Sequence, residues 1–235
     1  MCNPFEFLLE RLIREAREKQ EAERRNNPLA SLLSSGPQYN PYNTLLGSGL
    51  QPKRKVFISY HHGDDTEVRA FVKRWTETEQ VFIPKGLGLT FTDDIIRSSN
   101  PEYVMSQIRK KYLEDSTVTI VLLGSCTHSR RYVDWEIKAS LRQEEGGLPN
   151  GLMGIILPSL GTTAYLPPRL EENWDNSNVN CYARFWIAPR SASELRGWIE
   201  DAYSARTSRA NLIKNSTDMM KYNATCKTCG IIHPA

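Results

Sequence analysis

The chain of 235 residues is long enough for one substantial hydrophobic core and a small appendage, because domains usually run to about 100–200 residues. Its 40% hydrophobic and 24% charged residues are typical of a folded globular protein, which excludes a disordered, collagen-like or membrane-embedded chain. The formal net charge is +3, and the surplus of basic residues lies in residues 1–55. The neutral remainder gives no general electrostatic reason to bind nucleic acid, so we expect no such partner.

Cysteine usage and hydropathy indicate where the protein works. Five cysteines are an odd number, which argues against a disulfide framework and favours a reducing cytoplasm. The apolar run at residues 5–13 is interrupted by charges, and no stretch approaches the ~20 apolar residues of a membrane helix. We therefore expect a cytoplasmic protein without a membrane partner.

Residues 1–27 are predicted to form an amphipathic N-terminal helix. Pro4 suits a first helical turn, and apolar residues recur at helical spacing from Phe5 to Ala16. Residues 28–52 are rich in Pro, Gly, Ser and Asn and are predicted to be a linker. The apolar stripe of this helical arm either packs on the main domain or mediates self-association, and the sequence leaves both interpretations open.

From residue 53 onward, short apolar runs alternate with helical patterns. Expected strands cover residues 56–60, 81–84, 118–123, 152–157 and 182–187, and expected helices cover 64–78, 103–113, 129–143 and 192–205, with an irregular connection at 158–180. This alternation predicts an α/β domain over residues 53–206. We expect five parallel strands in the order 2-1-3-4-5 with helices on both faces, followed by a C-terminal tail at residues 207–235.

Ligands of such sheets bind beyond the carboxyl ends of the strands. Three predicted loops should therefore converge there, at residues 61–63, 85–100 and 124–128. The G-x-G-x-x-G fingerprint of dehydrogenases does not follow the first strand, which disfavours ordinary binding of an intact dinucleotide.

One carboxylate breaks the pattern of the helix that we expect Ser129 to cap. Glu136 borders the buried stripe, near the edge where ligands bind, so it is either paired structurally or kept for chemistry. On this helix the predicted core stripe is Val133, Ile137 and Leu141, and the predicted solvated side is Arg131, Asp134, Lys138 and Arg142.

Three segments together resemble Toll/interleukin-1 receptor (TIR) domains: KVFISY at residues 55–60, TVTIVLLGS at 117–125 and SRRYVDWEI at 129–137. The resemblance is closest to the TIR-like proteins of the bacterial Thoeris antiphage defence system. It implies a flavodoxin-like fold and a helix glutamate that cleaves NAD, and Glu136 stands at that position. The segment at 84–94 fits the flexible loop of the family only loosely.

The resemblance makes NAD the expected substrate, with no tightly bound cofactor. It further implies an ADP-ribose-derived product, cyclic or conjugated, that signals to a downstream effector, and a homo-oligomeric assembly. The candidate residues for contact with the substrate are Ser59, Tyr60, His61, Asp64, Phe91, Cys126 and Tyr132. Their alternative roles are packing at the strand ends and solvation of loops.

The tail carries Cys226, Cys229 and His233, which are three candidate zinc ligands where a closed structural site needs four. A fourth ligand would have to come from elsewhere, such as Cys2, Cys181 or another subunit. The alternative is a reduced tail that binds no metal.

Two other functions remain open from the sequence. One is a non-catalytic TIR scaffold that self-assembles and recruits partners. The other is an enzyme of the nucleoside deoxyribosyltransferase kind, which also sets a carboxylate against an anomeric carbon.

Overall fold

The computed structural model describes residues 52–87, 98, 100–143, 147–175 and 181–234. The chain divides into two compact units, residues 1–52 and 53–235, and the second is described here. The expected N-terminal helix lies outside the described residues, as does all of the expected linker except Pro52.

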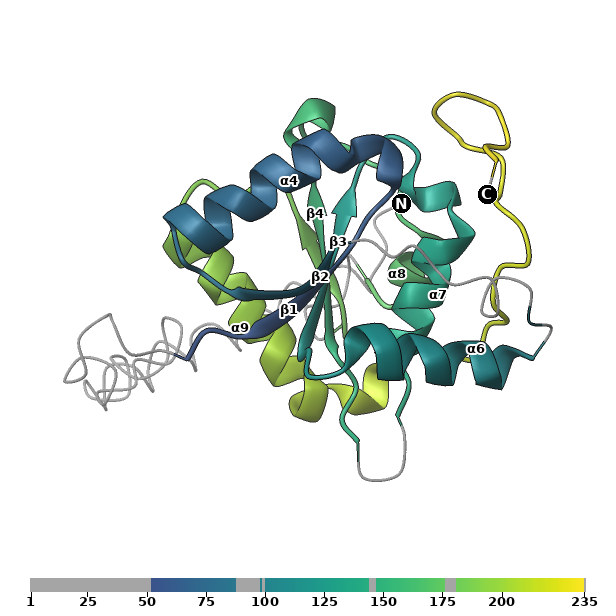
Figure 1. The fold of residues 1–235 in the computed structure, drawn as a ribbon, viewed down its shortest axis with the longest axis horizontal. Coiled ribbons are helices and arrows are strands. Elements are labelled where there is room, and N and C mark those ends of the chain that lie inside the picture. Colours follow the sequence, from purple (N-terminus) through teal and green to yellow (C-terminus); the bar gives the residue numbers. More distant parts are fainter. Residues whose placement is uncertain (1–51, 88–97, 99, 144–146, 176–180, 235) are drawn as a thin grey trace, which may run out of the picture. The chain divides into compact units, whose positions relative to one another are not determined.

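The second unit is built on a five-stranded parallel sheet in the order β2-β1-β3-β4-β5 (Figure 1). The predicted α/β fold and its strand order are therefore confirmed. The central strand β3 and its neighbour β4 are buried along their whole length. The strands are β1 (Lys55–Ser59), β2 (Ile83–Leu87), β3 (Val118–Leu123), β4 (Gly151–Ile156) and β5 (Arg184–Trp186).

Helices cover both faces of this sheet (Figure 1). On one face lie α4 (Asp65–Lys73), extended by the π-helical turn η2 (Arg74–Thr78), and α9 (Ala192–Ser208). The other face carries α6 (Pro101–Ile108) with its π-helical turn η3 (Arg109–Leu113), α7 (Arg131–Ser140) and α8 (Pro168–Glu172). Short 3-10 turns are η1 (His62–Asp64), η4 (Thr127–Ser129), η5 (Pro158–Leu160) and η6 (Ala210–Leu212).

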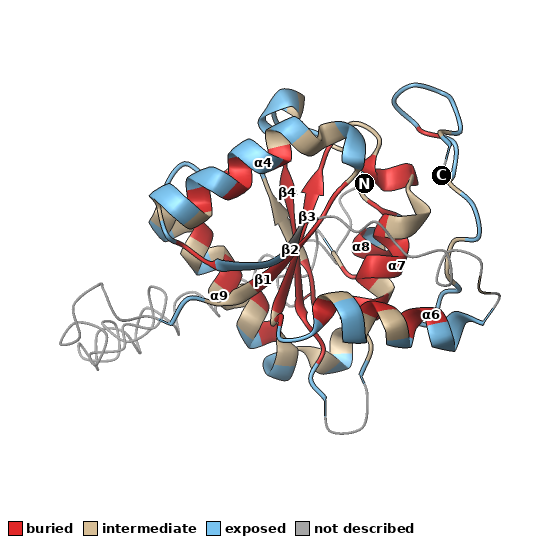
Figure 2. Ribbon diagram, in the orientation of Figure 1, coloured by how far each residue is buried: buried red, intermediate tan, exposed pale blue. Residues whose placement is uncertain are grey.

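Alternation along β1 decides which side chains face which helices. Val56 and Ile58 belong to the core under α4 and α9, whereas Phe57 packs against α6 and α7. Since neighbouring strand residues point to opposite faces, Ser59 continues the Phe57 side. Strands β1, β3 and β4 form the buried centre in Figure 2, and the last residue of β1 presents a hydroxyl toward α7.

Three local expectations are wrong. Strand β2 begins at Ile83 rather than residue 81, and Pro84 is tolerated because β2 lies at the edge of the sheet. The stretch at 158–180 is not wholly irregular, because Pro168 occupies the first turn of α8, where proline is favoured. Helix α7 begins at Arg131, so Ser129 does not cap it and instead ends the turn η4.

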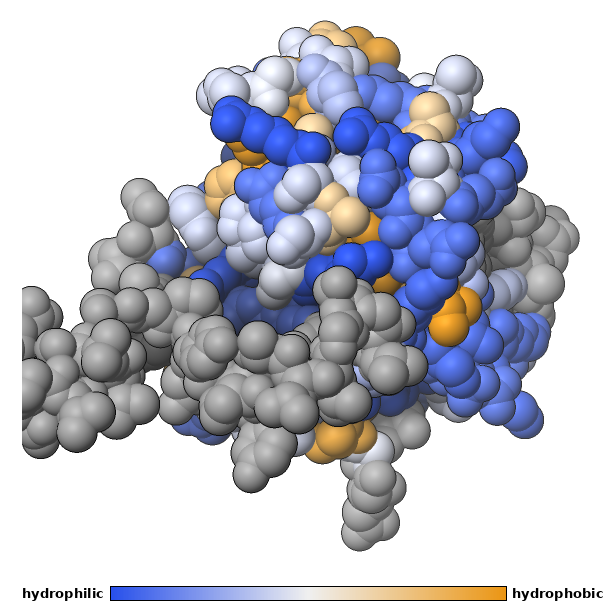
Figure 3. All heavy atoms as spheres, turned by 90° about the vertical axis from the view of Figure 1, so that its left-hand side faces the viewer, coloured by the Kyte–Doolittle hydropathy of each residue, from blue (hydrophilic) through white to orange (hydrophobic). Residues whose placement is uncertain are grey.

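The two faces of α4 explain the surface above it. Its apolar side chains Val68, Phe71 and Val72 are buried, while residues such as Arg69 and Lys73 are exposed. The face of the molecule in Figure 3 is accordingly mostly hydrophilic where residues are described, with apolar residues in small separate spots. Among the described residues, no helix combines the length and the apolar character needed to cross a bilayer.

Candidate functional site

Glu136 lies on α7 with its side chain turned toward the end of β1. The residue is 2% exposed, and the Ser59 hydroxyl donates a hydrogen bond to Glu136 Oε2. Ser59 itself is fully buried. One helical turn further, Ser140 Oγ lies 2.7 Å from Thr119 Oγ1 on β3. Glu136 and Ser140 therefore face the end of β1 and the beginning of β3, respectively.

Asp134, two residues before Glu136, has a different environment. The prediction that it lies on a solvated face is wrong, since Asp134 is 3% exposed. Its carboxylate accepts hydrogen bonds from Arg169 Nε at 2.9 Å and from the Met220 amide at 2.9 Å. Arg169 comes from α8 and Met220 from the C-terminal tail. Asp134 thus joins three segments of the structure.

The C-terminal tail covers the outer side of α7 (Figure 1). Its backbone carbonyls accept hydrogen bonds from Trp135 Nε1 (Met220 O, 2.8 Å) and from Lys138 Nζ (Thr217 O, 2.6 Å). None of the residues of α7 is exposed as a result. The predicted solvated side of this helix is therefore a contact surface for the tail.

Tyr60 follows Ser59 and lies within electrostatic reach of Glu136. Its hydroxyl donates to Asp65 Oδ1 at 2.6 Å, and the residue is 5% exposed. Burial, followed by the hydrogen bond to Asp65 and the charges of Asp65 and Glu136, raises the pKa of Tyr60 to about 12. The phenol stays protonated at neutral pH and remains a hydrogen-bond donor.

The loops after β1 and β3 converge, as predicted. Thr127 Oγ1 lies 3.5 Å from Asp64 Oδ2, and a Cβ added at Gly124 would lie 2.0 Å from the same oxygen. The absence of a side chain at Gly124 thus makes room for Asp64. Burial, with the nearby charge of Glu67, raises the pKa of Asp64.

His61 bridges these two loops. Its Nε2 lies 2.6 Å from Arg130 Nη2, so the neutral ring accepts a hydrogen bond from the guanidinium. Burial and the positive charge of Arg130 lower the pKa of His61 to about 4. The imidazole is therefore uncharged at neutral pH. The third expected loop, at 85–100, lies mostly outside the described residues, and Phe91 with it.

Tyr132 lies one turn before Glu136, at the start of α7. Its hydroxyl accepts a hydrogen bond from Arg131 Nη2 at 2.7 Å, and its ring packs edge-on against Trp135 with centroids 5.4 Å apart. Its ring also joins the apolar cluster between α6 and α7. These contacts belong to packing, and a contact of Tyr132 with substrate stays a prediction.

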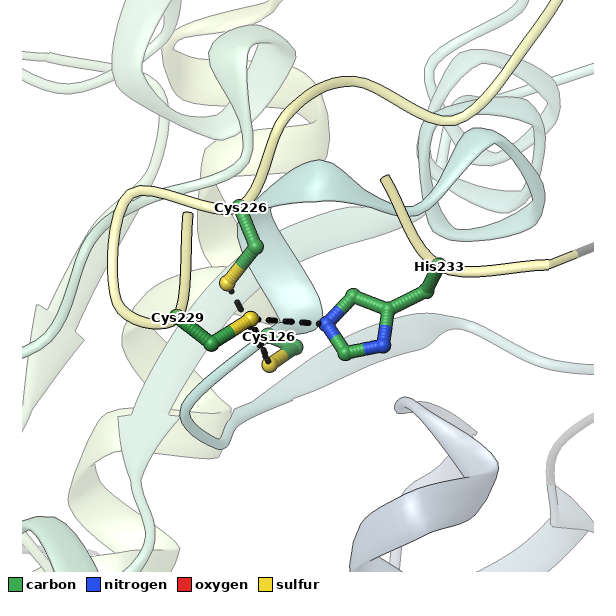
Figure 4. A group of neighbouring side chains, drawn as sticks. All are labelled: Cys126, Cys226, Cys229 and His233. Atoms are coloured by element: carbon green, nitrogen blue, oxygen red, sulfur yellow. Dashed lines mark hydrogen bonds between the residues drawn. The ribbon is translucent and has the colours of Figure 1, made fainter. Parts of the chain in front are cut away.

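The thiol of Cys126 meets the tail cysteines at the end of β3 (Figure 4). Its Sγ lies 3.2 Å from that of Cys226 and 4.0 Å from that of Cys229, and Cys229 Sγ lies 3.1 Å from His233 Nε2. Sequence reasoning placed Cys126 among substrate contacts and did not connect it with the tail. Cys181, an expected fourth ligand, instead bonds Ala183 O at 3.1 Å, and Cys2 lies outside the described residues.

A surface hollow of about 710 Å³ lies away from the predicted site. Leu141, Arg142 and Gln143 line it at the end of α7, together with residues that follow α9. None of the predicted site residues takes part in its lining. Helix α7 runs from the carboxyl edge of the sheet toward its amino edge, so this hollow and Glu136 belong to different parts of the helix.

Sequence reasoning missed three residues that organise the site: Thr127, Arg130 and Arg169. Thr127 carried a weak signal, because a hydroxyl three residues after a strand-end glycine suits a turn. Arg130 and Arg169 gave none, since their partners His61 and Asp134 are distant in sequence. A buried polar cluster with one near-inaccessible carboxylate can stabilise developing positive charge once a substrate is admitted.

Comparison with known proteins supports the resemblance found in the sequence. Residues 57–162 match the family described as Thoeris protein ThsB, TIR-like domain. The matched segment runs from β1 through β4 and includes both Ser59 and Glu136. None of the curated proteins compared with the chain matches it. The segment at 57–162, which carries most of the flavodoxin-like sheet, is therefore similar to the TIR-like domain of Thoeris protein ThsB.

Proposed function

We propose that this protein cleaves the bond between nicotinamide and ribose in NAD, with Glu136 as the catalytic residue. The product is an ADP-ribose-derived signalling molecule that acts in antiphage defence. The similarity of residues 57–162 to the TIR-like domain of Thoeris protein ThsB supports the assignment to antiphage defence. The observation that carries the chemistry is the buried Glu136 carboxylate, oriented by the Ser59 hydroxyl at the carboxyl end of β1.

Cleavage of this bond requires a carboxylate near the ribose and little acid catalysis. As the bond from the ribose C1′ to the pyridinium nitrogen breaks, its electron pair goes to nicotinamide, which leaves as a neutral molecule. Positive charge develops on the ribose, and a carboxylate beside it stabilises that charge, as in glycosidases. A nucleophile then bonds to C1′ and loses its proton. Water gives ADP-ribose, and the adenine of the same molecule gives a cyclic product.

The surroundings of Glu136 suit this role in one further respect. Tyr60 is a protonated phenol, and His61 is a neutral imidazole held by Arg130. Both lie on the residues that directly follow Ser59, at the edge of the sheet where ligands bind. These two groups form an uncharged polar wall beside the ribose, with the Tyr60 hydroxyl held by Asp65 and the His61 ring held by Arg130.

The 2% exposure of Glu136 sets a condition on the activity. A substrate reaches the carboxylate only after neighbouring groups move, so we propose that the form described here is a resting one. The homo-oligomeric assembly that the TIR resemblance implies is proposed to supply this movement, since catalytic sites are commonly completed by loop movement.

The test is incubation of the full-length protein with NAD and identification of products by mass spectrometry, in both purified and infection-activated material. We expect Glu136→Gln to abolish nicotinamide release while the far-UV circular dichroism spectrum is kept. Asp134→Asn is the matched control for charge on the same helix. It should weaken folding and leave the turnover of the remaining folded protein close to that of the parent.

Two results would overturn the proposal. Release of nicotinamide by Glu136→Gln at the parental rate in activated material would remove the catalytic role. Silence of the parent in activated material, with assembly intact, would favour the non-catalytic scaffold. Deoxynucleosides tested in parallel identify base exchange as the reaction if they alone are consumed.

A further inference from the structure

Three cysteines and one histidine converge on one point at the end of β3. One ligand atom from each of Cys126, Cys226, Cys229 and His233 lies within 4.8 Å of every other (Figure 4). Cys126 comes from the loop after β3, and the other three come from the tail. Within the described part of the chain, these four residues are the His, Cys, Asp and Glu side chains that lie close enough together to hold one metal ion.

We propose that these four residues bind one zinc ion in a closed structural site. Tetrahedral zinc with Zn–S bonds of about 2.3 Å separates its sulfur ligands by about 3.8 Å. The sulfur separations of 3.2 and 4.0 Å from Cys126 bracket this value. Four protein ligands fill the tetrahedron, so no position is left for water or substrate, and the ion holds structure rather than performing catalysis.

The tail is already folded into the shape that two cysteine ligands need. Cys226 and Cys229 stand three residues apart, and the Gly230 amide donates to Cys226 O at 2.8 Å. Gly230 has a φ of 76°, a left-handed conformation that glycine adopts without strain. The Cys226 amide in turn donates to Ile231 O at 2.9 Å, which closes a tight hairpin. This turn brings both thiols to the same side.

The loop after β3 contributes a matching second surface. The Lys227 amide donates to His128 Nε2 at 2.9 Å, and the Thr228 hydroxyl donates to Ser125 O at 2.7 Å. The residues on either side of Cys126 therefore fix the hairpin against the loop. Such contacts around the ligands orient them and commonly matter for metal affinity.

Charge at the site is balanced by a nearby cation. Zinc with three thiolates and one neutral histidine carries one net negative charge. The Arg130 guanidinium interacts electrostatically with all three thiols and donates to Pro234 O at 3.1 Å. It also reaches His61 at 2.6 Å. Arg130 thus links the proposed metal site to the loop that follows Ser59.

Binding of the ion exchanges three thiol protons for one zinc ion and involves no redox step. The inference is independent of NAD cleavage, since a scaffold would need the same clamp between tail and loop. Failure of NAD cleavage would therefore leave it standing. The alternative state of these cysteines is a disulfide, but all four described cysteines are free.

The experiment measures metal in the full-length protein, purified through a removable tag that does not bind metal. Elemental mass spectrometry should find about one zinc ion per chain. The Cys126→Ser/Cys226→Ser double variant should contain at least about tenfold less zinc. Cys181→Ser is the matched control, because Cys181 is a buried thiol that bonds Ala183 O away from this group. It should keep its zinc. His233→Cys, which preserves four ligands, should keep it as well.

Measurements without mutation keep the test valid if the double variant does not fold. Cobalt loaded in place of zinc should give the strong visible absorption of tetrahedral thiolate coordination. A chelator should lower the melting temperature of the parent and speed amide exchange in residues 224–233. A parent that lacks zinc and takes up no cobalt would overturn the proposal. So would an intact mass showing a Cys126–Cys226 disulfide, or a folded double variant with parental zinc content.

Discussion

At the scale of single residues, the pair Ser59 and Glu136 joins a strand end to a neighbouring helix. Alternation along β1 sends Phe57 and Ser59 toward α7, where Glu136 interrupts an otherwise apolar contact. A serine hydroxyl is a small, neutral donor, so it orients the carboxylate without cancelling its charge. Under the proposed function we therefore expect Ser59 to position Glu136 rather than to contact the reacting atoms.

Replacing Ser59 with alanine tests this positioning role. A hydrogen bond to a charged group contributes about 1.5–3 kcal/mol, so Ser59→Ala should lower kcat/KM for NAD by about 10- to 100-fold. Ser59→Thr keeps the hydroxyl and should recover most of the activity. Ser140→Ala is the control. It removes another buried hydroxyl, on the helix that carries Glu136, and this hydroxyl pairs with Thr119 rather than with Glu136. Equal activity of Ser59→Ala and the parent would contradict the assignment.

The sequence named Ser59 and Glu136 as separate candidate residues, and the hydrogen bond between them was not predicted. Ser59 was identified by its place at the end of the first strand, and Glu136 by its place on the helix and by the TIR resemblance. Asp134 was misplaced because its burial depends on Arg169 and on Met220, neither of which is local. Phe91 lies outside the described residues, and its predicted role stays a prediction.

At the scale of elements, β4 and α9 approach each other closely enough that one position requires glycine. A Cβ added at Gly151 would lie 1.9 Å from Ala202 O, a backbone atom of α9. Backbone of a helix packed along its length cannot move aside as a side chain can. Gly151 therefore lets α9 lie directly on the first residue of β4.

Gly151→Ala should accordingly destabilise the protein, by about 1–3 kcal/mol or more in the free energy of unfolding, because overpacking shifts the backbone. Gly197→Ala provides the matched control within α9, where nothing lies within 4 Å of an added Cβ. It should be neutral or stabilise by up to about 1 kcal/mol, since alanine favours a helix. Chemical denaturation measures both, and equal effects of the two variants would refute the packing argument.

Element types followed from the sequence more readily than their limits did. Strand β3 was predicted at its observed bounds, because a buried apolar run has sharp edges. Helix α8 was missed because it spans only Pro168–Glu172, too short for helical periodicity to register. The predicted start of β2 was two residues too early because the buried Val81 and Phe82 precede the strand. In a sequence, buried apolar residues outside a strand cannot be distinguished from buried residues within one.

At the scale of residues 53–235, the tail acts as a strap along α7. Backbone carbonyls of the tail accept hydrogen bonds from Trp135 and Lys138. Any residue type has such a carbonyl, so these hydrogen bonds cannot be predicted from the pattern of side chains. The sequence therefore predicted a tail without predicting where it docks. The buried ion pair of Asp134 and Arg169 lies beneath this strap.

Arg169→Met should destabilise the protein by about 3–5 kcal/mol, because it leaves the buried Asp134 carboxylate without its cation. Arg169 also donates to Asp218 O at 3.1 Å, so the tail should loosen at the same time. Glu102→Gln breaks a surface pair with Arg142 and should cost less than about 1 kcal/mol. Thermal and urea unfolding measure the loss of stability, and amide hydrogen exchange of residues 213–223 measures the loosening of the tail. A loss below 1 kcal/mol in Arg169→Met would show that the pair does not anchor the strap.

The contact between Cys126 and Cys226 has a consequence for synthesis of the protein. The two thiols are separated by 100 residues, and ribosomes add about 5–20 residues per second. The loop after β3 therefore waits roughly 5–20 seconds for its partner, and during this time β4 and β5 are added to the three strands already made. During that interval the start of α7, and with it the helix that carries Glu136, lacks its outer cover. Nascent chains should be inert and sensitive to oxidants until translation reaches the hairpin.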